Sequence, residues 1–224
     1  MYVERPVEIL RPPHFDAPAD GCRMLFDYGN ETILTNQIAV DTLFIGDSIT
    51  QLWDVYAFFP NQGFLVNRGI GGDTAGVVAK RLEADALQLK PARCIVLVGI
   101  NDIFHMGMSG YAGTPDEMLV YLKDCYYSIC TQMAEHHIPL LFGSVLPIWL
   151  ENQELMMQTN ALILRINQFL QSLCEQQGAQ YVDYHSALSA DGLTLRRDVS
   201  HDGIHPHVIG YNRMAEVLRP LLTN

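Results

Sequence analysis

The sequence predicts an α/β fold in which a parallel sheet of about five strands lies between two layers of helices. Short apolar runs alternate with longer stretches of helical spacing along most of the chain. The runs are apolar at almost every position, which indicates strands covered on both faces. Alternating strands and helices also favour parallel strands joined by right-handed crossovers. Together these observations predict a three-layer α/β/α sandwich.

The expected strands are short and are bounded by residues that break regular structure. They lie at residues 42–45, 64–67, 94–98, 140–145 and 181–182. Glycines follow the first three, at positions 46, 69 and 99, and prolines at 139 and 147 bracket the fourth. In an open parallel sheet, ligands bind beyond the carboxyl ends of the strands. The residues that follow each strand are therefore the first candidates for a functional site.

The stretches between these strands have the spacing of amphipathic helices. Expected helices lie at residues 77–89, 117–136, 151–177 and 208–222. In the first of them, Val78, Leu82, Ala86 and Leu89 recur every three or four residues and share one face. Each helix is expected to bury such a face against the sheet.

Residues 1–40 are the least regular part of the chain. Prolines at positions 6, 12, 13 and 18 argue against a long helix there. The segment is expected to be an arm packed on the body, a lid or an oligomer contact. We therefore divide the chain into an N-terminal arm or extension, residues 1–40, and one domain, residues 41–224.

Bulk composition limits the classes of function. The chain has 224 residues, 49% of them hydrophobic and 17% charged, which suits a single globular domain. Its formal net charge of −11 argues against binding to nucleic acids or anionic membranes, because both are polyanions. No apolar run is long enough for a membrane span.

The N-terminus and the cysteines both favour an intracellular, cytoplasmic protein. Glu4 and Arg5 stand where a signal peptide needs an apolar core. The 5 cysteines form no C-x-x-C pair, so free thiols in a reducing compartment are expected.

The first expected strand is followed by Gly46 and then by two polar residues, Asp47 and Ser48. Glycine allows a tight turn from strand to helix, which would place the Ser48 hydroxyl at the rim of the sheet. Unpaired backbone N–H groups at a helix start favour negative charge, which suits a nucleophile. Serine is also a good helix N-cap, and these residues alone favour that simpler interpretation of Ser48.

The next two strands are followed by glycines and an asparagine. Gly69, Gly71 and Gly72 bring the backbone close to a ligand, or they form a flexible turn capped by Asp73 or Thr74. The segment lacks the spacing of a P-loop or a dinucleotide fingerprint. A backbone N–H aimed at a developing oxyanion is the catalytic alternative. After the third strand, Asn101 supplies either a side-chain donor at the same rim or a local cap.

Asp202 and His205 stand three residues apart before the last expected helix. This spacing lets a carboxylate fix the imidazole tautomer, so that His205 accepts a proton from Ser48. A metal site at residues 201–207, which contain three histidines and Asp202, is the alternative. Its spacing matches no standard zinc pattern, so no metal and no cofactor are expected.

These fragments, in this order, resemble the motif blocks of the SGNH hydrolase superfamily, also called GDSL esterases. G-D-S-I at 46–49 resembles the block that supplies the nucleophile, here Ser48. G-G-D-T at 71–74 resembles the block whose glycine N–H enters the oxyanion hole; Gly72 is the better match and Gly71 the rival. The resemblance covers roughly residues 41–220 and implies a flavodoxin-like SGNH hydrolase fold.

The remaining blocks complete the set of functional residues that the resemblance implies. G-I-N-D at 99–102 resembles the third block and places Asn101 in the oxyanion hole with the Ser48 amide. D-G-I-H-P at 202–206 resembles the last and completes the triad with Asp202 and His205. The residues in and around these motifs are also similar to those of the branch that contains platelet-activating-factor acetylhydrolase subunits and bacterial sugar acetylesterases.

The resemblance implies a serine hydrolase of short acyl, chiefly acetyl, esters of a small soluble molecule or sugar. A lysophospholipase, a thioesterase, a metal-dependent hydrolase and a non-catalytic binding protein on the same fold are the alternatives. The loops at residues 103–115 and 146–149, with Trp149, are expected to shape the substrate site or to be ordinary rim packing. The apolar region at 120–129 permits a homodimer.

Overall fold

A computed structural model describes residues 7–12, 19–106 and 113–222 of the chain. Its centre is a parallel sheet of five strands in the order β2-β1-β3-β4-β5. The strands are β1 (Thr42–Gly46), β2 (Leu65–Gly69), β3 (Cys94–Leu97), β4 (Leu140–Gly143) and β5 (Gln180–Val182). The predicted number of strands and their parallel direction are confirmed.

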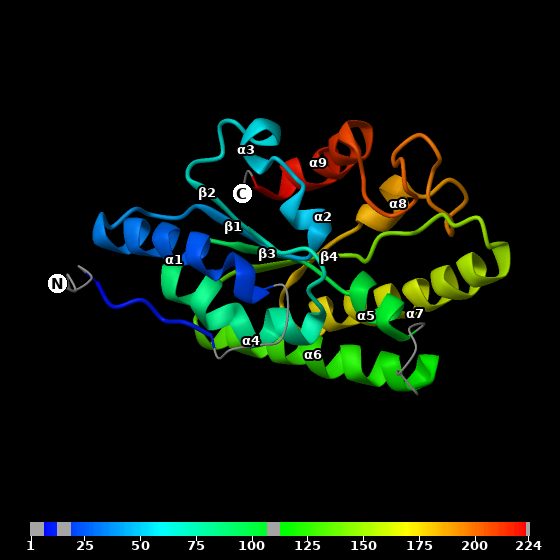
Figure 1. Cartoon of the computed structure of the whole chain (residues 1–224), viewed down its shortest axis with the longest axis horizontal. Helices are drawn as coiled ribbons and strands as arrows, with labels where there is room; N and C mark the ends of the chain where they lie inside the picture. The colour runs from blue at the N-terminus through cyan, green and yellow to red at the C-terminus, as the bar shows by residue number, and fades with distance from the viewer. Residues whose placement is uncertain (1–6, 13–18, 107–112, 223–224) are drawn as a thin grey trace.

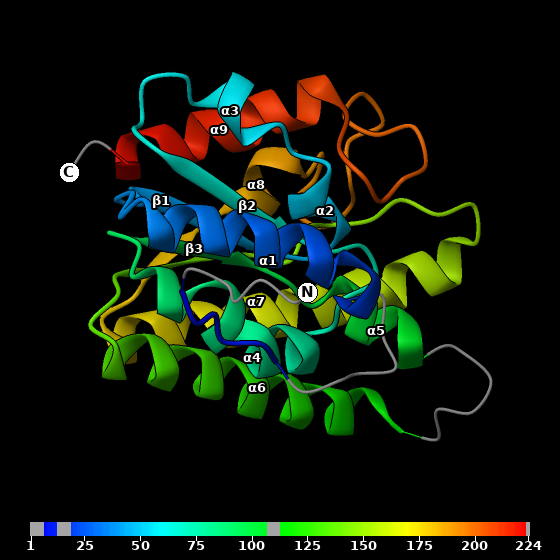
Figure 2. The same cartoon turned by 60° about the vertical axis from the view of Figure 1, so that its left-hand side comes forward.

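Helices cover both faces of the sheet, as Figure 1 and Figure 2 show. One layer contains α4 (Ala75–Asp85), α6 (Pro115–Glu135) and α7 (Gln153–Gln177). The other contains α3 (Val55–Phe58), α8 (Tyr184–Leu188) and α9 (Val208–Leu222). Every residue of β1, β3 and β4 is buried, which explains why these strands are apolar on both faces. The predicted three-layer α/β/α sandwich is confirmed.

The order of the strands creates a switch point beside β1. The chain leaves β1 for β2 on one side and then returns to β3 on the other, so Gly46 pairs with Gly69 and with Leu97. Connections from two neighbouring strands diverge at this point and leave a crevice at their carboxyl ends. The short helices α2 (Ser48–Gln51) and α5 (Ile100–Met106) begin there.

Local signals fix the ends of the helices. Thr114 and Glu117 form a reciprocal capping box, and Pro115 follows Thr114, so α6 starts two residues before the apolar pattern alone suggests. Gly178 ends α7 in a left-handed conformation (φ 69°). The helix expected at 77–89 is divided: α4 ends at Asp85, and a 3₁₀ turn, η1 (Leu87–Leu89), follows.

The expectation that residues 1–40 lack a long helix is wrong. Helix α1 (Ala19–Thr35) has 17 residues and packs on α4 and η1. The prolines used against a helix all precede residue 19, and proline restricts only its own neighbourhood. A hydrogen bond from the Asn30 side chain to the Ala84 carbonyl (2.9 Å) joins α1 to α4.

Residues 103–106, expected as part of a loop, belong to α5, and residues 107–112 lie outside the described part of the chain. No helix in the described ranges is both long and apolar enough to cross a membrane.

Candidate active site

Ser48, His205 and Asp202 lie in hydrogen-bonding contact although they are far apart in the sequence. The Ser48 Oγ is 2.9 Å from His205 Nε2, and His205 Nδ1 is 2.6 Å from Asp202 Oδ2. A carboxylate accepts hydrogen bonds, so Nδ1 carries the proton and Nε2 is free to accept from the serine hydroxyl. The arrangement can therefore withdraw a proton from Ser48.

The end of β1 places Ser48 at the rim of the sheet. A side chain at Gly46 would lie 2.0 Å from the Leu97 carbonyl oxygen, so only glycine allows this close approach of β1 and β3. Asp47 is the N-cap of α2, because its carboxylate accepts a hydrogen bond from the Ile49 N–H (2.9 Å). The interpretation of Ser48 as the cap is therefore wrong, and the Ser48 hydroxyl is left to bond His205.

The segment before α9 holds Asp202 and His205 in a tight turn. Asp202 Oδ1 accepts hydrogen bonds from the backbone N–H groups of Ile204 (2.9 Å) and His205 (2.8 Å) and from Ser200 Oγ (3.1 Å). Partial burial disfavours the charged form of Asp202, but the hydrogen bonds from His205, Ile204 and Ser200 outweigh it and lower the pKa of this carboxyl. Asp202 is therefore a carboxylate at neutral pH.

The loop between β2 and α4, residues 70–74, is called the glycine loop here and lies against the same rim. The Gly71 N–H donates to Gln51 Oε1 (2.8 Å), so this amide already has an acceptor. Gly72 is exposed and has a positive φ of 86°, which side-chain-bearing residues rarely adopt. Of the two candidates, Gly72 thus presents the accessible backbone N–H. No described residue accepts a hydrogen bond from it.

Asn101 and Asp102 fasten the start of α5 to this glycine loop. Asn101 Nδ2 donates one hydrogen bond to the Asp73 carbonyl (2.9 Å), which leaves its second N–H for a ligand. The Asp102 carboxylate accepts from the Ala75 N–H, with oxygens at 2.9 and 3.2 Å. The loop segment is thereby held between two neighbouring side chains of α5.

A completely buried arginine joins the segments around the site. Arg81 bonds the carboxylate of Asp73 through Nε (2.6 Å) and that of Asp85 through Nη1 (2.9 Å). Its Nη2 donates to the carbonyls of Gly46 (3.0 Å) and Arg68 (2.9 Å). One side chain thus bonds the end of β1, the end of β2 and the glycine loop.

Burial also affects two carboxyls near Ser48. Asp47 and Asp102 are 1% and 2% exposed, and burial raises the pKa of each to about 7. Backbone N–H donors partly oppose this shift by favouring the charged form. Both groups consequently hold their protons to a higher pH than an ordinary aspartate does.

The sequence motifs around this site are shared with known proteins. A family model described as the GDSL-like lipase/acylhydrolase family matches residues 44–213, which is most of the chain. The chain belongs to this GDSL-like hydrolase family. Its relatives include carboxylic ester hydrolases, and the chain is one of this class. The resemblance drawn from the sequence motifs is therefore confirmed.

Three proteins illustrate what this GDSL-like hydrolase is similar to in sequence or in structure. An acetylxylan esterase of Geobacillus stearothermophilus is 28% identical over 165 residues, which cover 71% of this chain and 72% of that one. A GDSL-like lipase of Bacteroides thetaiotaomicron has a similar structure (TM-score 0.71, 21% identity, 88% and 97% of the two chains). A mutant acetyl-xylooligosaccharide esterase from Geobacillus is also similar (TM-score 0.67, 20% identity, 84% and 96%). At these identities the two structures show the fold alone.

The residues of this GDSL-like hydrolase that were predicted to shape the substrate site differ in how far their side chains are buried. Trp149 is half-buried on the loop after β4, and its ring is covered by the Arg197 guanidinium at 3.5 Å. Phe104 packs partly against the core, whereas His105 is exposed. Residues 108 and 111, expected near the mouth, lie outside the described part.

The histidine-rich segment at 201–207 has no metal-binding arrangement among the described residues. Asp202 and His205 bond each other, while the His201 and His207 rings lie with their centroids 4.5 Å apart. Within residues 7–12, 19–106 and 113–222, no group of three or more His, Cys, Asp or Glu is placed to hold a metal ion.

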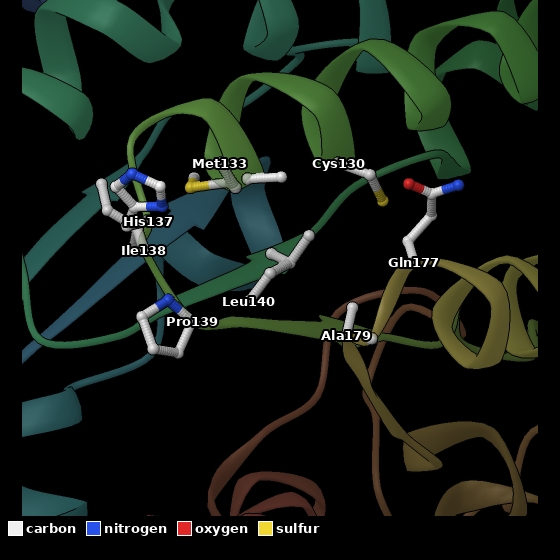
Figure 3. Close-up of a pocket in the computed structure, with 10 residues that line it drawn as sticks. Cys130, Met133, His137, Ile138, Pro139, Leu140, Gln177 and Ala179 are labelled. Carbon is white, nitrogen blue, oxygen red and sulfur yellow. The ribbon is translucent and has the colours of Figure 1, made fainter.

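A pocket that contains Cys130 lies at the other end of the sheet from Ser48. Figure 3 shows a pocket at the start of β4, lined by Cys130, His137 and Gln177 among others. It lies at the amino ends of the strands, and Ser48 lies at the carboxyl ends. Burial raises the pKa of Cys130 to about 11, so its thiol is a poor nucleophile at neutral pH.

The roles of Arg81 and Asp85 and the contact made by Asp102 were not predicted from the sequence. The signal for the first two was present, because Arg81 and Asp85 are four residues apart and share the buried face of α4 with Val78 and Leu82. A charged pair on an apolar helix face indicates a buried ion pair. The contact of Asp102 with Ala75 had no such signal, since it depends on how two strands are placed.

Proposed function

We propose that this ester hydrolase cleaves short acyl esters, chiefly acetyl esters of a small soluble molecule or sugar, through an acyl-enzyme on Ser48. The observation that carries the proposal is the hydrogen-bonded relay from Ser48 Oγ to His205 and Asp202, at 2.9 and 2.6 Å. The proposed N–H donors, at Ser48, Gly72 and Asn101, follow β1, β2 and β3 at the same edge of the sheet, which suits acyl transfer.

In the first half-reaction, Ser48 Oγ attacks the ester carbonyl while His205 Nε2 accepts the hydroxyl proton. Asp202 holds the imidazole in the correct tautomer and stabilises the imidazolium that forms. His205 then donates this proton to the departing alcohol, and the acyl group remains on Ser48. In the second half-reaction, His205 activates water, which releases the acid and restores the serine.

Three donors would stabilise the negative oxygen of the tetrahedral intermediate. They are the backbone N–H groups of Ser48 and Gly72 and the second N–H of the Asn101 side chain. The Ser48 amide belongs to the first turn of α2, where N–H groups have no acceptor within the helix. Donors fixed before reaction stabilise developing charge without a reorganisation cost.

The proposed preference for acetyl groups rests on a relative whose name specifies its substrate. The acetylxylan esterase shares 28% identity over 165 residues, and its name specifies an acetyl ester of a sugar polymer. We infer an acetylated carbohydrate or a similarly small acetyl ester as the substrate.

Exposed apolar side chains favour longer acyl groups as a second candidate. Leu52 is 59% exposed four residues after Ser48, and Val208 is 63% exposed three residues after His205. A hydrogen bond from Tyr211 Oη to the Ile49 carbonyl (2.8 Å) ties α9, which begins at Val208, to α2, which ends beside Leu52. An apolar surface there would suit a lysophospholipase or thioesterase.

Hydrolysis of p-nitrophenyl acetate and p-nitrophenyl octanoate separates these candidates. We expect the wild type to cleave acetate faster, Ser48→Ala to abolish cleavage, and a chelator to have no effect. Faster cleavage of octanoate would favour the long-chain candidate. Retained activity in Ser48→Ala would contradict the serine mechanism, and loss on chelation would favour a metal-dependent hydrolase.

A further inference from the structure

A cavity distinct from the pocket at Cys130 lies beside the loop that carries Asp202 and His205. It has a volume of about 200 Å³ and lies between the loop after β4 and the segment before α9. Its lining includes Trp149, Arg196, Arg197, Ser200, His201 and Gly203. The acyl-transfer chemistry described above uses none of these side chains directly except Ser200, which bonds Asp202.

The two walls of this cavity are held firmly together. The Trp149 N–H donates to the Gly203 carbonyl at 2.9 Å. Gly203 has a positive φ of 83°, and a Cβ there would lie 2.0 Å from the Trp149 carbonyl oxygen. Such close backbone contact requires glycine and fixes Trp149 relative to the catalytic segment.

Arg197 is positioned by Trp149 but has no acidic partner in the described part of the chain. Its guanidinium carbon lies 3.5 Å from the centroid of the Trp149 ring, so the two groups stack. No Asp or Glu among the described residues forms an ion pair with it. Stacking uses the flat face of a guanidinium and leaves its N–H edges free for an acceptor.

The neighbouring arginine, Arg196, differs from Arg197 because it has an acidic partner. Arg196 bonds both carboxylate oxygens of Asp198, at 2.9 and 3.0 Å, and Arg213 lies 3.9 Å from the same group. Asp198 therefore neutralises Arg196, while the charge of Arg197 stays uncompensated. An uncompensated cation beside a pocket is notable in a chain with a net charge of −11.

The cavity is also close to the reacting groups. Gly203 stands two residues before His205, so their Cα atoms are at most about 7 Å apart. Ser200 Oγ lines the cavity and donates to Asp202 Oδ1 at 3.1 Å. One small ester could reach Ser48 with its carbonyl and this cavity with another group.

We propose that this cavity binds an anionic group, a carboxylate or a phosphate, on the substrate, so that the enzyme acts on esters of acidic molecules. The inference rests on the proposed esterase function and narrows its substrate class. A guanidinium recognises carboxylates and phosphates through two parallel hydrogen bonds. Because stacking already holds Arg197 in place, little side-chain freedom is lost on binding.

A neutral sugar stacked on Trp149 is the competing occupant. Arg197 already covers one face of that ring at 3.5 Å, so this face is not open to a sugar. The polar and cationic lining supplied by Arg197, His201 and Ser200 also suits an anion better than an apolar group.

Matched acetyl esters test the proposal. We would compare acetylated methyl glucoside, acetylated methyl glucuronoside and acetylated glucose 6-phosphate, which carry no charge, a carboxylate and a phosphate. The wild type should favour at least one anionic ester over the neutral ester by about tenfold or more in kcat/KM. Arg197→Gln should remove this preference mainly by raising KM for the anionic ester. Arg165→Gln, which removes a charge on α7, should keep the preference.

Binding to inactive protein separates this proposal from the esterase function. Calorimetric titration of Ser48→Ala with glucuronate and with inorganic phosphate should show binding of one anion, and the added Arg197→Gln change should abolish it. Absent binding, or binding that survives Arg197→Gln, would overturn the anionic site even in an active esterase. Binding without cleavage of any ester would leave this site standing and contradict the proposed function instead.

Discussion

Arg81 and Asp73 form an ion pair in which neither side chain has any exposed surface, with 2.6 Å between Nε and Oδ2. Asp73 belongs to the glycine loop, and its carbonyl accepts the hydrogen bond from Asn101. The same arginine bonds the carbonyl of Gly46 at the end of β1. The buried pair therefore fixes the glycine loop relative to β1, the strand that precedes Ser48.

Removal of the arginine should destabilise the protein strongly. In Arg81→Met, the carboxylates of Asp73 and Asp85 lose their ion pairs with Arg81, so the free energy of unfolding should fall by about 3–5 kcal/mol. Urea unfolding followed by circular dichroism measures this quantity.

An exposed ion pair provides the control for this change. Arg165 and Asp116 are 2.6 Å apart, but their side chains are 48% and 81% exposed. Arg165→Met should change the free energy of unfolding by no more than about 1 kcal/mol. Equal effects of the two substitutions would contradict the role assigned to Arg81.

The Asn101 side chain should contribute to rate more than to substrate binding. Asn101→Ala removes one oxyanion donor, so kcat should fall by about 10²–10³ with little change in KM. Steady-state hydrolysis of p-nitrophenyl acetate gives both constants. A rise in KM at constant kcat would instead place Asn101 in ground-state binding.

Loss of the base should cost more activity than loss of the group that orients it. We expect His205→Ala to lower kcat by about 10⁶ and Asp202→Asn by about 10⁴, because the second variant keeps an imidazole. Both values come from the acetate assay. A larger loss in Asp202→Asn than in His205→Ala would be inconsistent with these roles.

The buried carboxyl of Asp102 should make stability depend on pH. Its pKa is about 7 in the folded protein and near the ordinary aspartate value of 3.8 in the unfolded chain. Between these values the folded state binds more protons, so this group lowers the free energy of unfolding as the pH rises from about 4 to about 7.

Asp102→Asn should remove this contribution, and the wild type should therefore lose up to about 1.4 kcal/mol per pH unit more than the variant in that window. Urea unfolding at several pH values gives the two slopes. Parallel slopes would show that Asp102 does not titrate in this range.

The sequence predicted the fold and the proposed catalytic residues because their signals are local. Ser48 and Asn101 follow glycines at strand ends, and Asp202 and His205 share one short turn. The choice between Gly71 and Gly72 needed the structure, since it depends on which amide bonds Gln51.

Other features could not be predicted from local patterns. The role of Arg81 depends on the placement of β1, β2 and the glycine loop in space. The prolines before residue 19 disfavour a helix only in their own neighbourhood, so they do not argue against α1, which begins at Ala19. The arm-and-domain division, the cytoplasmic location and the homodimer through residues 120–129 stay predictions.

Covalent labelling tests the central claim most directly. The wild type would be treated with a fluorophosphonate, which phosphonylates activated serines, and digested peptides would be analysed by mass spectrometry. The account predicts one phosphonyl group on Ser48, much slower labelling in His205→Ala and none in Ser48→Ala. Labelling at another residue, or equal labelling of wild type and Ser48→Ala, would show that Ser48 is not the nucleophile.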